Sequence, residues 1–413
     1  MTTACVAKRT CRLCNSARLE QVVTLTPTPP GNRVLTEHET RGENPVFPLT
    51  VSFCSDCHHV QLGHVVAPEI LYRNHYSYVS GTSPVFVAHF RDYAAFAVER
   101  FALAPGALVV DIGSNDGTGL QFFKERGMTV LGVDPASEIA AAATARGIET
   151  VDDFFGPALA ERLRRERGAA KLVSSHNACA HIDDLGGVID GVRTLLADDG
   201  VFVMEVGYFV DVFGKGWFDT IYHEHLDYHT VEPLLGFFER HGMEVFAVQR
   251  IAPQGGSIRV MAQRAGGRRA VDGSVAELVK LEHELGLDRA DTVRTFQSKL
   301  DRIKGELREL LGGLRAQGKT IAGYGAPTKS TTLMMHFDLG KDVIDFIVDD
   351  NPLKQGFYTP GTFVPIGPSS LLYERKPDYV LILAWNFAEP IMKQHPSFAG
   401  RFIVPMPEPR IVS

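Results

Sequence analysis

The chain has 413 residues, of which 45% are hydrophobic and 22% are charged, which is the composition of a globular protein with more than one domain. Its net charge of -7 argues against a nucleic-acid-binding protein, because such a protein needs a basic face. No apolar run approaches the ~18 residues of a membrane span, and no signal-peptide pattern follows Met1, so we expect a cytoplasmic protein without a membrane or nucleic-acid partner.

Four of the six cysteines form two CxxC pairs, Cys11 with Cys14 and Cys54 with Cys57. Two disulfides or free core thiols are the alternative, but disulfides are disfavoured in a reducing cytosol. Two such pairs can bring four thiolates to one tetrahedral Zn²⁺. Four sulfur ligands leave no open coordination position, so the spacing predicts a structural zinc in a ribbon domain that spans residues 1–71.

Residues 72–285 alternate between strand and helix patterns, which predicts a parallel α/β sheet with helices on both faces. An amphipathic helix is expected over residues 84–101, before the first strand. Two later strands are close enough in sequence to form a hairpin at the edge of the sheet. The expected strands lie at residues 108–112, 128–133, 172–175, 201–206, 244–250 and 256–262.

The first of these strands runs into a glycine-rich loop, VVDIGSNDGTG. Its G-x-x-x-G-x-G spacing differs from the dinucleotide fingerprint and resembles the first motif of class I S-adenosylmethionine-dependent methyltransferases. A carboxylate that ends the next strand, Asp134, can bind ribose hydroxyls, and Asp111 is expected near the methionine amino group. The candidate cofactor-binding residues are Asp111, Gly113, Asn115, Gly117, Gly119, Asp134, Asp153, Phe154 and Asn177.

The segment from Phe218 to Thr230, FDTIYHEHLDYHT, concentrates acid-base side chains after a buried-strand pattern. The carboxyl end of a parallel strand is where open α/β sheets place their reactive groups. Tyr222, Glu224 and His225 are the candidates, and His181 follows the preceding strand. His223 and His225 could instead bind a metal, although the sequence around them offers no obvious third and fourth ligands.

The stretch from residue 286 to 413 is predicted to be a long linking helix, over residues 288–314, followed by a Rossmann-like domain. Its GYGAPTKS segment is similar to a degraded dinucleotide fingerprint, with Asp349 and Asp350 near the position of a ribose-binding acid. A NAD-dependent nucleotide-sugar dehydrogenase is therefore one alternative. A zinc-ribbon nucleic-acid methyltransferase is another, and the acidic charge weighs against it.

Six motifs occur in one order along nearly the whole chain: CxxC…CxxCxHxQ, G-x-x-x-G-x-G, FDTIYHEHLDYHT, QGGSIR, GYGAPTKS and NPLKQGFYTPG. This series resembles the three-domain sugar C-methyltransferases of deoxysugar biosynthesis, and is nearest to their C-3-methylating members in the pathway to D-tetronitrose. The resemblance implies S-adenosylmethionine and a structural zinc as cofactors. It also implies a dTDP-linked 4-ketosugar, with a 3-amino group, as the substrate of an antibiotic pathway.

The chemistry of such a reaction explains the acid-base segment, because carbon becomes a nucleophile only after a proton beside a carbonyl is removed. We expect His225 to be the base. Glu224 is expected to orient or tune His225, or to bind the substrate amine, and Tyr222, Tyr76 and His181 to bind the oxyanion or the sugar. Five C-terminal residues are expected to contact the nucleotide sugar: Lys329, Ser330, Lys354, Tyr358 and Gly361. No exposed heptad seam stands out, so we expect a monomer.

Overall fold

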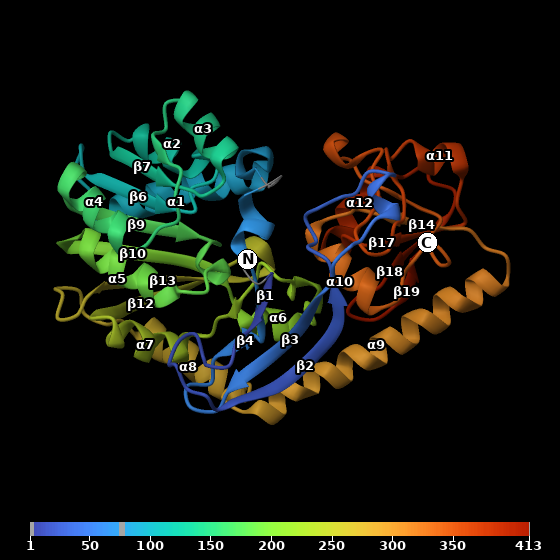
Figure 1. The fold of residues 1–413 in the computed structure, drawn as a ribbon, viewed down its shortest axis with the longest axis horizontal. Coiled ribbons are helices and arrows are strands. Elements are labelled where there is room, and N and C mark those ends of the chain that lie inside the picture. Colours follow the sequence, from blue (N-terminus) through green and yellow to red (C-terminus); the bar gives the residue numbers. More distant parts are fainter. Residues whose placement is uncertain (1–3, 74–78, 413) are drawn as a thin grey trace.

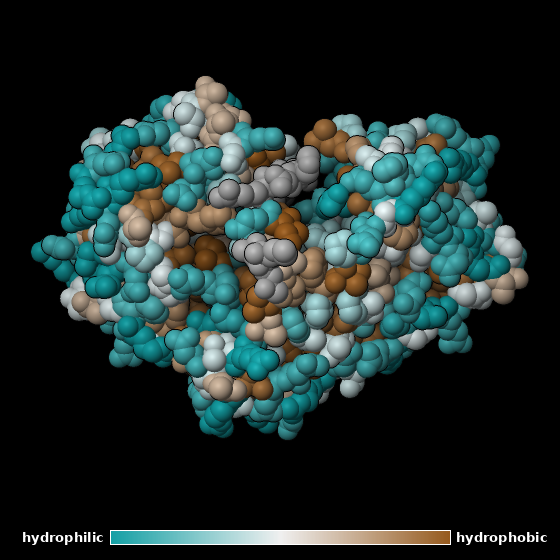
Figure 2. Space-filling model, viewed as in Figure 1, coloured by the Kyte–Doolittle hydropathy of each residue, from teal (hydrophilic) through white to brown (hydrophobic). Residues whose placement is uncertain are grey.

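The computed structural model describes residues 4–73 and 79–412, and these form two lobes above a common base (Figure 1). One lobe is built on a seven-stranded sheet and the other on a six-stranded sheet. The long strands β2 (Leu19–Thr28) and β3 (Phe47–Cys54) and the helix α9 (Ala290–Ala316) run below both lobes and connect them (Figure 1). Figure 2 shows hydrophobic residues gathered where the two lobes meet.

The N-terminal region forms a small antiparallel sheet in the order β11-β4-β3-β2. Two of its strands are short, β4 (Val60–Leu62) and β11 (Asp227–Tyr228). The last strand comes from the acid-base segment, which the sequence alone did not indicate. Pairing of β11 with β4 satisfies backbone groups that an edge strand would leave open. A separate two-stranded sheet pairs β1 (Cys5–Ala7) with β5 (His64–Val66).

The seven-stranded sheet has the order β12-β13-β10-β9-β6-β7-β8, in which the last five strands are parallel. The predicted strands and the edge hairpin are confirmed within a few residues at most ends, although β10 begins earlier than predicted. The strand bounds are β6 (Leu108–Ile112), β7 (Thr129–Val133), β8 (Thr150–Val151), β9 (Ala170–His176), β10 (Leu196–Gly207), β12 (Met243–Ile251) and β13 (Ser257–Arg264).

Helices pack around this sheet, and α1 (Pro84–Arg100) shows how the sequence starts one of them. Ser83 caps the helix by accepting a hydrogen bond from the Phe86 amide, and Pro84 takes the first turn, where no amide donor is needed. The other helices of this part are α2 (Thr118–Lys124), α3 (Ser137–Ala145), α4 (Pro157–Arg167), α5 (Leu185–Leu195), α6 (Phe209–Lys215), α7 (Val231–Arg240) and α8 (Gly273–Glu284).

Helix α9 has the predicted apolar stripe, and most of its members are buried, from Val293 to Leu314. Leu310 is only partly buried, and the helix continues through Gly312 and Gly313 to Ala316, two residues beyond the predicted end. A helix can pass through glycine when a packed apolar face on both sides holds it. None of the helices in the described parts of the chain is long and apolar enough to cross a membrane.

The C-terminal lobe is a Rossmann-like sheet in the order β16-β15-β14-β17-β18-β19, with only β19 antiparallel. The GYGAPTKS loop lies between β14 and α10, as predicted. The bounds are β14 (Ile321–Tyr324), β15 (Phe346–Val348), β16 (Ile366–Gly367), β17 (Tyr379–Ile382), β18 (Arg401–Val404), β19 (Arg410–Val412), α10 (Thr328–His336), α11 (Leu371–Arg375) and α12 (Ala388–Gln394).

Candidate active site

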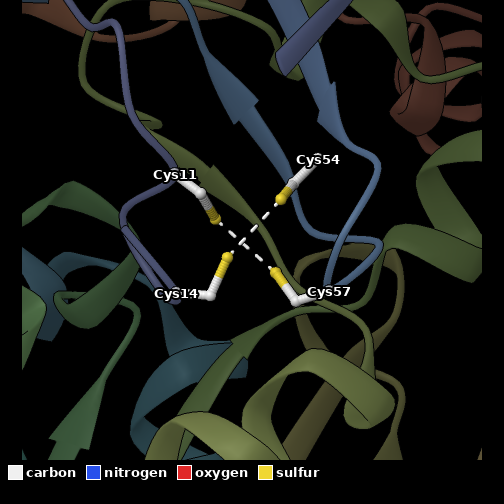
Figure 3. A group of neighbouring side chains, drawn as sticks. All are labelled: Cys11, Cys14, Cys54 and Cys57. Carbon is white, nitrogen blue, oxygen red and sulfur yellow. Dashed lines mark hydrogen bonds between the residues drawn. The ribbon is translucent and has the colours of Figure 1, made fainter. Parts of the chain in front are cut away.

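The four predicted zinc ligands converge on one point, with their sulfur atoms facing one another (Figure 3). The Sγ atoms of Cys11 and Cys57 lie 3.6 Å apart and those of Cys14 and Cys54 3.5 Å apart, too far for disulfides. A tetrahedral zinc with Zn–S bonds of about 2.3 Å separates its sulfurs by about 3.8 Å. The four residues therefore fit a closed, structural zinc site.

A buried hydrogen bond links this zinc region to the acid-base segment. His59, two residues after the second CxxC pair, places its Nε2 atom 2.7 Å from Asp227 Oδ1, and neither side chain is exposed. The Arg12 amide donates to Gln61, and the Arg12 guanidinium donates to the Leu226 carbonyl. The zinc ribbon therefore holds the far end of the acid-base segment in place.

The glycine-rich loop has the backbone that a close-fitting cofactor requires. Gly113 and Gly117 have φ values of +73° and +76°, in the left-handed region that favours glycine. A Cβ atom on Gly113 would lie 2.4 Å from Ala178 Cβ, and one on Gly117 would lie 2.8 Å from an Ile148 methyl group. Gly119 differs, because a Cβ there would make only an ordinary contact with Phe90, at 3.5 Å.

Two buried carboxylates border this loop. Asp134, at the end of β7, accepts hydrogen bonds from the Asn115 amide (2.8 Å) and the Ala136 amide (2.9 Å). Each oxygen keeps a further lone pair, as a ribose-binding carboxylate needs. Asp111 accepts from Ser174, at 2.8 Å, and burial raises its pKa to about 6. Both carboxylates therefore fit the roles that a class I methyltransferase fold assigns to them.

The other predicted cofactor residues surround the same loop. Asn115 accepts a hydrogen bond from the Ser80 amide with its side chain, which ties the loop to the segment before α1. Asn177 has a φ of +58° and donates its amide to the Glu205 carbonyl. Asp153 and Phe154 follow β8 and are exposed, with 40% of Phe154 accessible, so a flat ring can stack there.

His225 is partly buried and its hydrogen bonds define its tautomer. Its Nδ1 atom lies 2.7 Å from the Thr220 carbonyl oxygen, which can only accept, so Nδ1 carries the proton. Its Nε2 atom therefore has a lone pair and accepts from the Tyr222 hydroxyl, at 2.9 Å. Burial lowers the pKa of His225 to about 4, so the ring is neutral at physiological pH.

His181 connects this dyad to the cofactor loop. Its ring centroid lies 5.0 Å from that of His225, and the Leu226 amide donates to the Ala180 carbonyl. Three residues earlier, Ala178 is the residue that leaves no room for a side chain on Gly113. The pKa of His181 is lowered to about 3, first by burial and then by His225. The turn over residues 178–181 thus brings the acid-base segment beside the glycine-rich loop.

Glu224 is 4% exposed, and its side chain bonds to a residue that no sequence pattern singles out. Asn32, in the connection between β2 and β3, donates from Nδ2 to Glu224 Oε1 at 2.5 Å. Burial raises the pKa of Glu224 to about 8, although the hydrogen bond from Asn32 opposes this shift. The carboxyl group is therefore close to the midpoint of its titration at physiological pH.

The metal-binding alternative for His223 and His225 receives no support from their surroundings. His223 directs Nε2 to the Phe47 carbonyl oxygen, at 3.3 Å, and its ring is separate from the dyad. Within residues 4–73 and 79–412, the groups whose ligand atoms come close together are the four cysteines and a second set, His89, His176 and Glu205. Neither set includes the two histidines of the acid-base segment.

The second set is a polar network that sequence reasoning did not assemble, because its members come from α1, β9 and β10. Glu205 Oε2 lies 2.7 Å from His89 and 3.0 Å from His176, while Oε1 accepts from Arg259 at 2.6 Å. Arg259 also lies over the Tyr93 ring, at 4.9 Å. The guanidinium of Arg259 already balances the charge of the Glu205 carboxylate.

The predicted substrate-binding residues of the C-terminal lobe have protein partners. Lys329 donates to Asn386 Oδ1 (2.5 Å), lies 3.9 Å from Asp219 Oδ2, and stands 5.5 Å from the ring centres of both Trp217 and Trp385. Ser330, 2% exposed, donates to the Pro327 carbonyl oxygen. Lys329 thus connects the lobe to the residues just before the acid-base dyad.

Of the remaining C-terminal candidates, Tyr358 and Gly361 lie along the connection between β2 and β3. Lys354 donates to the Ala326 carbonyl oxygen at 2.7 Å, and burial lowers its pKa. Tyr358 pairs its backbone with Leu35, and Gly361 has a φ of +75° against Pro29. The last catalytic candidate, Tyr76, falls outside the described residues.

Three family comparisons match successive parts of the chain. Residues 11–72 match a zinc binding domain, residues 86–248 a methyltransferase domain, and residues 252–407 a C-methyltransferase C-terminal domain. Together with the convergent cysteines and the glycine-rich loop, these matches establish S-adenosylmethionine and zinc as the cofactors.

Individual proteins also match parts or nearly all of the chain. Two solved structures each match 43% of the chain. One is a methyltransferase in complex with the Haloferax volcanii Trm112 activator, at 17% identity and a TM-score of 0.33, and the match covers 97% of that chain. The other is a Synechocystis magnesium protoporphyrin IX methyltransferase with bound SAH, at 15% identity and a TM-score of 0.34, and the match covers 83% of that chain. C-methyltransferase NovU of Streptomyces niveus is 39% identical over 98% of this chain and 96% of its own length. The chain therefore belongs to the zinc-containing, S-adenosylmethionine-dependent C-methyltransferase family that includes NovU.

Proposed function

We propose that the protein methylates C-3 of a dTDP-linked 3-amino-4-keto deoxysugar by way of an enolate. The observation that carries this proposal is the Tyr222–His225 dyad, a neutral imidazole whose lone pair meets a phenol at 2.9 Å beside the cofactor loop. Methyl transfer to oxygen or nitrogen would not need a base that removes a proton from carbon. Transfer to a carbon beside a ketone needs both a base and a donor for the enolate oxygen.

The geometry of the dyad suits such a step. In a 4-ketosugar, the C-3 hydrogen and the ketone oxygen are on adjacent carbons, so two groups about 3 Å apart can engage both. Tyr222 would turn its hydroxyl from His225 to the ketone oxygen, and the freed Nε2 would accept the proton from C-3. The electron pair of the C–H bond then moves into the enolate, whose negative oxygen Tyr222 stabilises. Bound S-adenosylmethionine would supply the electrophilic methyl group that replaces the lost proton on C-3.

Glu224 is suited to bind the amino group on C-3. Its carboxyl group lies next to the dyad in sequence and is held on one side by Asn32, which leaves the other oxygen for the substrate. An amine beside a buried carboxylate forms a charge-assisted hydrogen bond. His181, beside His225, and Tyr76 remain our candidates for contacts to the sugar.

We place the dTDP group against the C-terminal lobe, near Lys354, Tyr358 and Gly361. The N-terminus of α10 and the GYGAPTKS loop would attract its phosphates. Lys329 and Ser330 belong to the same helix start, but Lys329 would have to exchange Asp219 for the diphosphate.

The test is to incubate the purified protein with S-adenosylmethionine and a dTDP-3-amino-4-keto deoxysugar, and to analyse the product by mass spectrometry and NMR. The expected product carries one additional methyl group on C-3. A methyl group on C-5, the other carbon beside the ketone, would contradict the position. A methyl group on nitrogen or oxygen, or NAD-dependent redox chemistry without methylation, would contradict the proposal as a whole.

A further inference from the structure

Asn32 is a point where three parts of the molecule meet. It belongs to the connection between β2 and β3, its Nδ2 atom donates to Glu224 of the acid-base segment, and its Oδ1 atom accepts from Thr328 Oγ1 at the start of α10. The Asn32 amide thus bridges the carboxyl group of Glu224 and the first turn of α10.

The backbone around Asn32 is tightly docked on that lobe. A Cβ atom on Gly31 would lie 2.6 Å from the Thr328 carbonyl oxygen, so only glycine allows this approach. Leu35 and Tyr358 exchange backbone hydrogen bonds of 2.9 Å and 2.8 Å. Asn32 is thus held from both sides, in the way that a pre-organised donor has to be.

The surroundings of Glu224 leave much of its charge stabilisation to Asn32. Along its own segment the neighbouring titratable groups are Tyr222, His223 and His225, and burial keeps both histidines neutral. The Tyr72 hydroxyl donates to the Glu224 backbone carbonyl, at 3.5 Å. Within the part of the chain that the structure describes, no lysine or arginine forms an ion pair with this carboxylate.

We propose that Asn32 is a positioning residue that presents Glu224 as an oriented carboxylate to the amino group of the substrate. An N–H donor stabilises the ionised form of a carboxyl group and disfavours the protonated form. Burial acts in the opposite direction and raises the pKa of Glu224 to about 8. The opposing effects of burial and of the Asn32 amide determine what fraction of the enzyme carries Glu224 in its ionised form. This inference rests on the proposed function.

The experiment compares the pH profile of kcat/KM for the wild type and for Asn32→Ala. Loss of the donor should raise the midpoint of the acidic limb by about one pH unit and reduce kcat/KM at pH 7 about tenfold, with recovery at high pH. Thr328→Val should shift the midpoint in the same direction by less. Asn44→Ala is the matched control, because Asn44 donates only to backbone carbonyls of its own loop, and its profile should equal the wild type.

A second measurement needs no substrate and separates this inference from the proposed function. With carboxyl-¹³C glutamate, and Glu224 assigned from Glu224→Gln, NMR follows its titration directly. Asn32→Ala should raise the midpoint, and should not alter the pH dependence of the Glu224→Gln variant. An unchanged or lower midpoint, or a uniform loss of kcat/KM at every pH, would overturn the inference. If Glu224 responds as expected but the sugar is not methylated at C-3, only the proposed function fails.

Discussion

At the scale of single residues, the role of His225 as the base depends on which of its ring nitrogens holds a lone pair. The Thr220 carbonyl oxygen fixes the proton on Nδ1, so Nε2 faces Tyr222 and, in our proposal, the substrate. The pKa of about 4 means that the base is neutral and ready over the whole physiological range. Activity should therefore show no loss from protonation of His225 between pH 6 and pH 8.

Tyr222→Phe should separate the two roles of the dyad. The variant keeps a neutral His225 with a free Nε2 atom but lacks the donor for the enolate oxygen, so kcat should fall about 100-fold with little change in KM. Steady-state kinetics at saturating S-adenosylmethionine measure both values. An unchanged kcat would show that Tyr222 does not stabilise the transition state.

Glu224→Gln should stabilise the protein in a pH-dependent manner. The pKa of Glu224 is about 8 in the folded state, above its unfolded value, so its contribution to stability is complete below about pH 4 and is lost as pH rises through 8. At pH 7 the neutral amide should increase the free energy of unfolding by roughly 3 kcal/mol, and at pH 4 by almost nothing. Denaturant melts at both pH values test this, and equal effects at both would contradict the raised pKa.

The candidate acid-base residues could be selected from the sequence, but the residues that hold them could not. Tyr222, Glu224 and His225 could be selected because three acid-base groups stand together in one segment. Asn32 lies 192 residues before Glu224 in a turn-like stretch, and nothing in its neighbourhood signals a partner. The network around Glu205 is similar, since His89, His176 and Arg259 meet it only after the sheet has formed.

At the scale of elements, the glycine-rich loop and the alternation of strands and helices were predictable because they follow from local patterns. The alternation of apolar strands with helices indicates a parallel sheet, and glycine spacing indicates a tight loop at its carboxyl edge. The pairing of β11 with β4 was not predictable. Two residues are too few to show a strand pattern, and their partner lies far away in sequence.

Gly113→Ala should weaken cofactor binding by changing only the glycine-rich loop. The new Cβ would meet Ala178 at 2.4 Å and the residue would keep an unfavourable positive φ, so we expect the affinity for S-adenosylmethionine to fall at least about tenfold. Gly106→Ala is the matched control, because Gly106 has a φ of +82° but open space around it. Calorimetry should show normal binding for the control, and equal losses in both variants would assign the effect to backbone strain.

At the scale of the whole molecule, the zinc ribbon supports the catalytic segment from a distance. The second CxxC pair leads directly into β4, which pairs with β11, and His59 bonds to Asp227 within that strand. The zinc site therefore stabilises the C-terminal end of the acid-base segment, the segment that contains His225. Lys329 and Trp385 hold its beginning from the C-terminal lobe through Asp219, so both lobes and the base meet at one short stretch.

Cys54→Ser should show this dependence. We expect a bound zinc of one per chain in the wild type, and in the variant a loss of zinc, a melting temperature lower by roughly 10 °C and no methyl transfer. Cys5→Ser is the control, because Cys5 lies in β1 outside the cluster. Elemental analysis with thermal melts provides the readout, and a stable, active variant without zinc would contradict a supporting role.

Hydrogen exchange at the sugar in deuterated water, without S-adenosylmethionine, tests directly whether His225 removes the proton from C-3. NMR distinguishes C-3 from C-5, the two carbons beside the ketone. The account predicts that the wild type incorporates deuterium at C-3 and not at C-5, and that His225→Asn lowers this rate to that of the free sugar. Exchange at C-3 that persists in His225→Asn would contradict the assignment of His225 as the base.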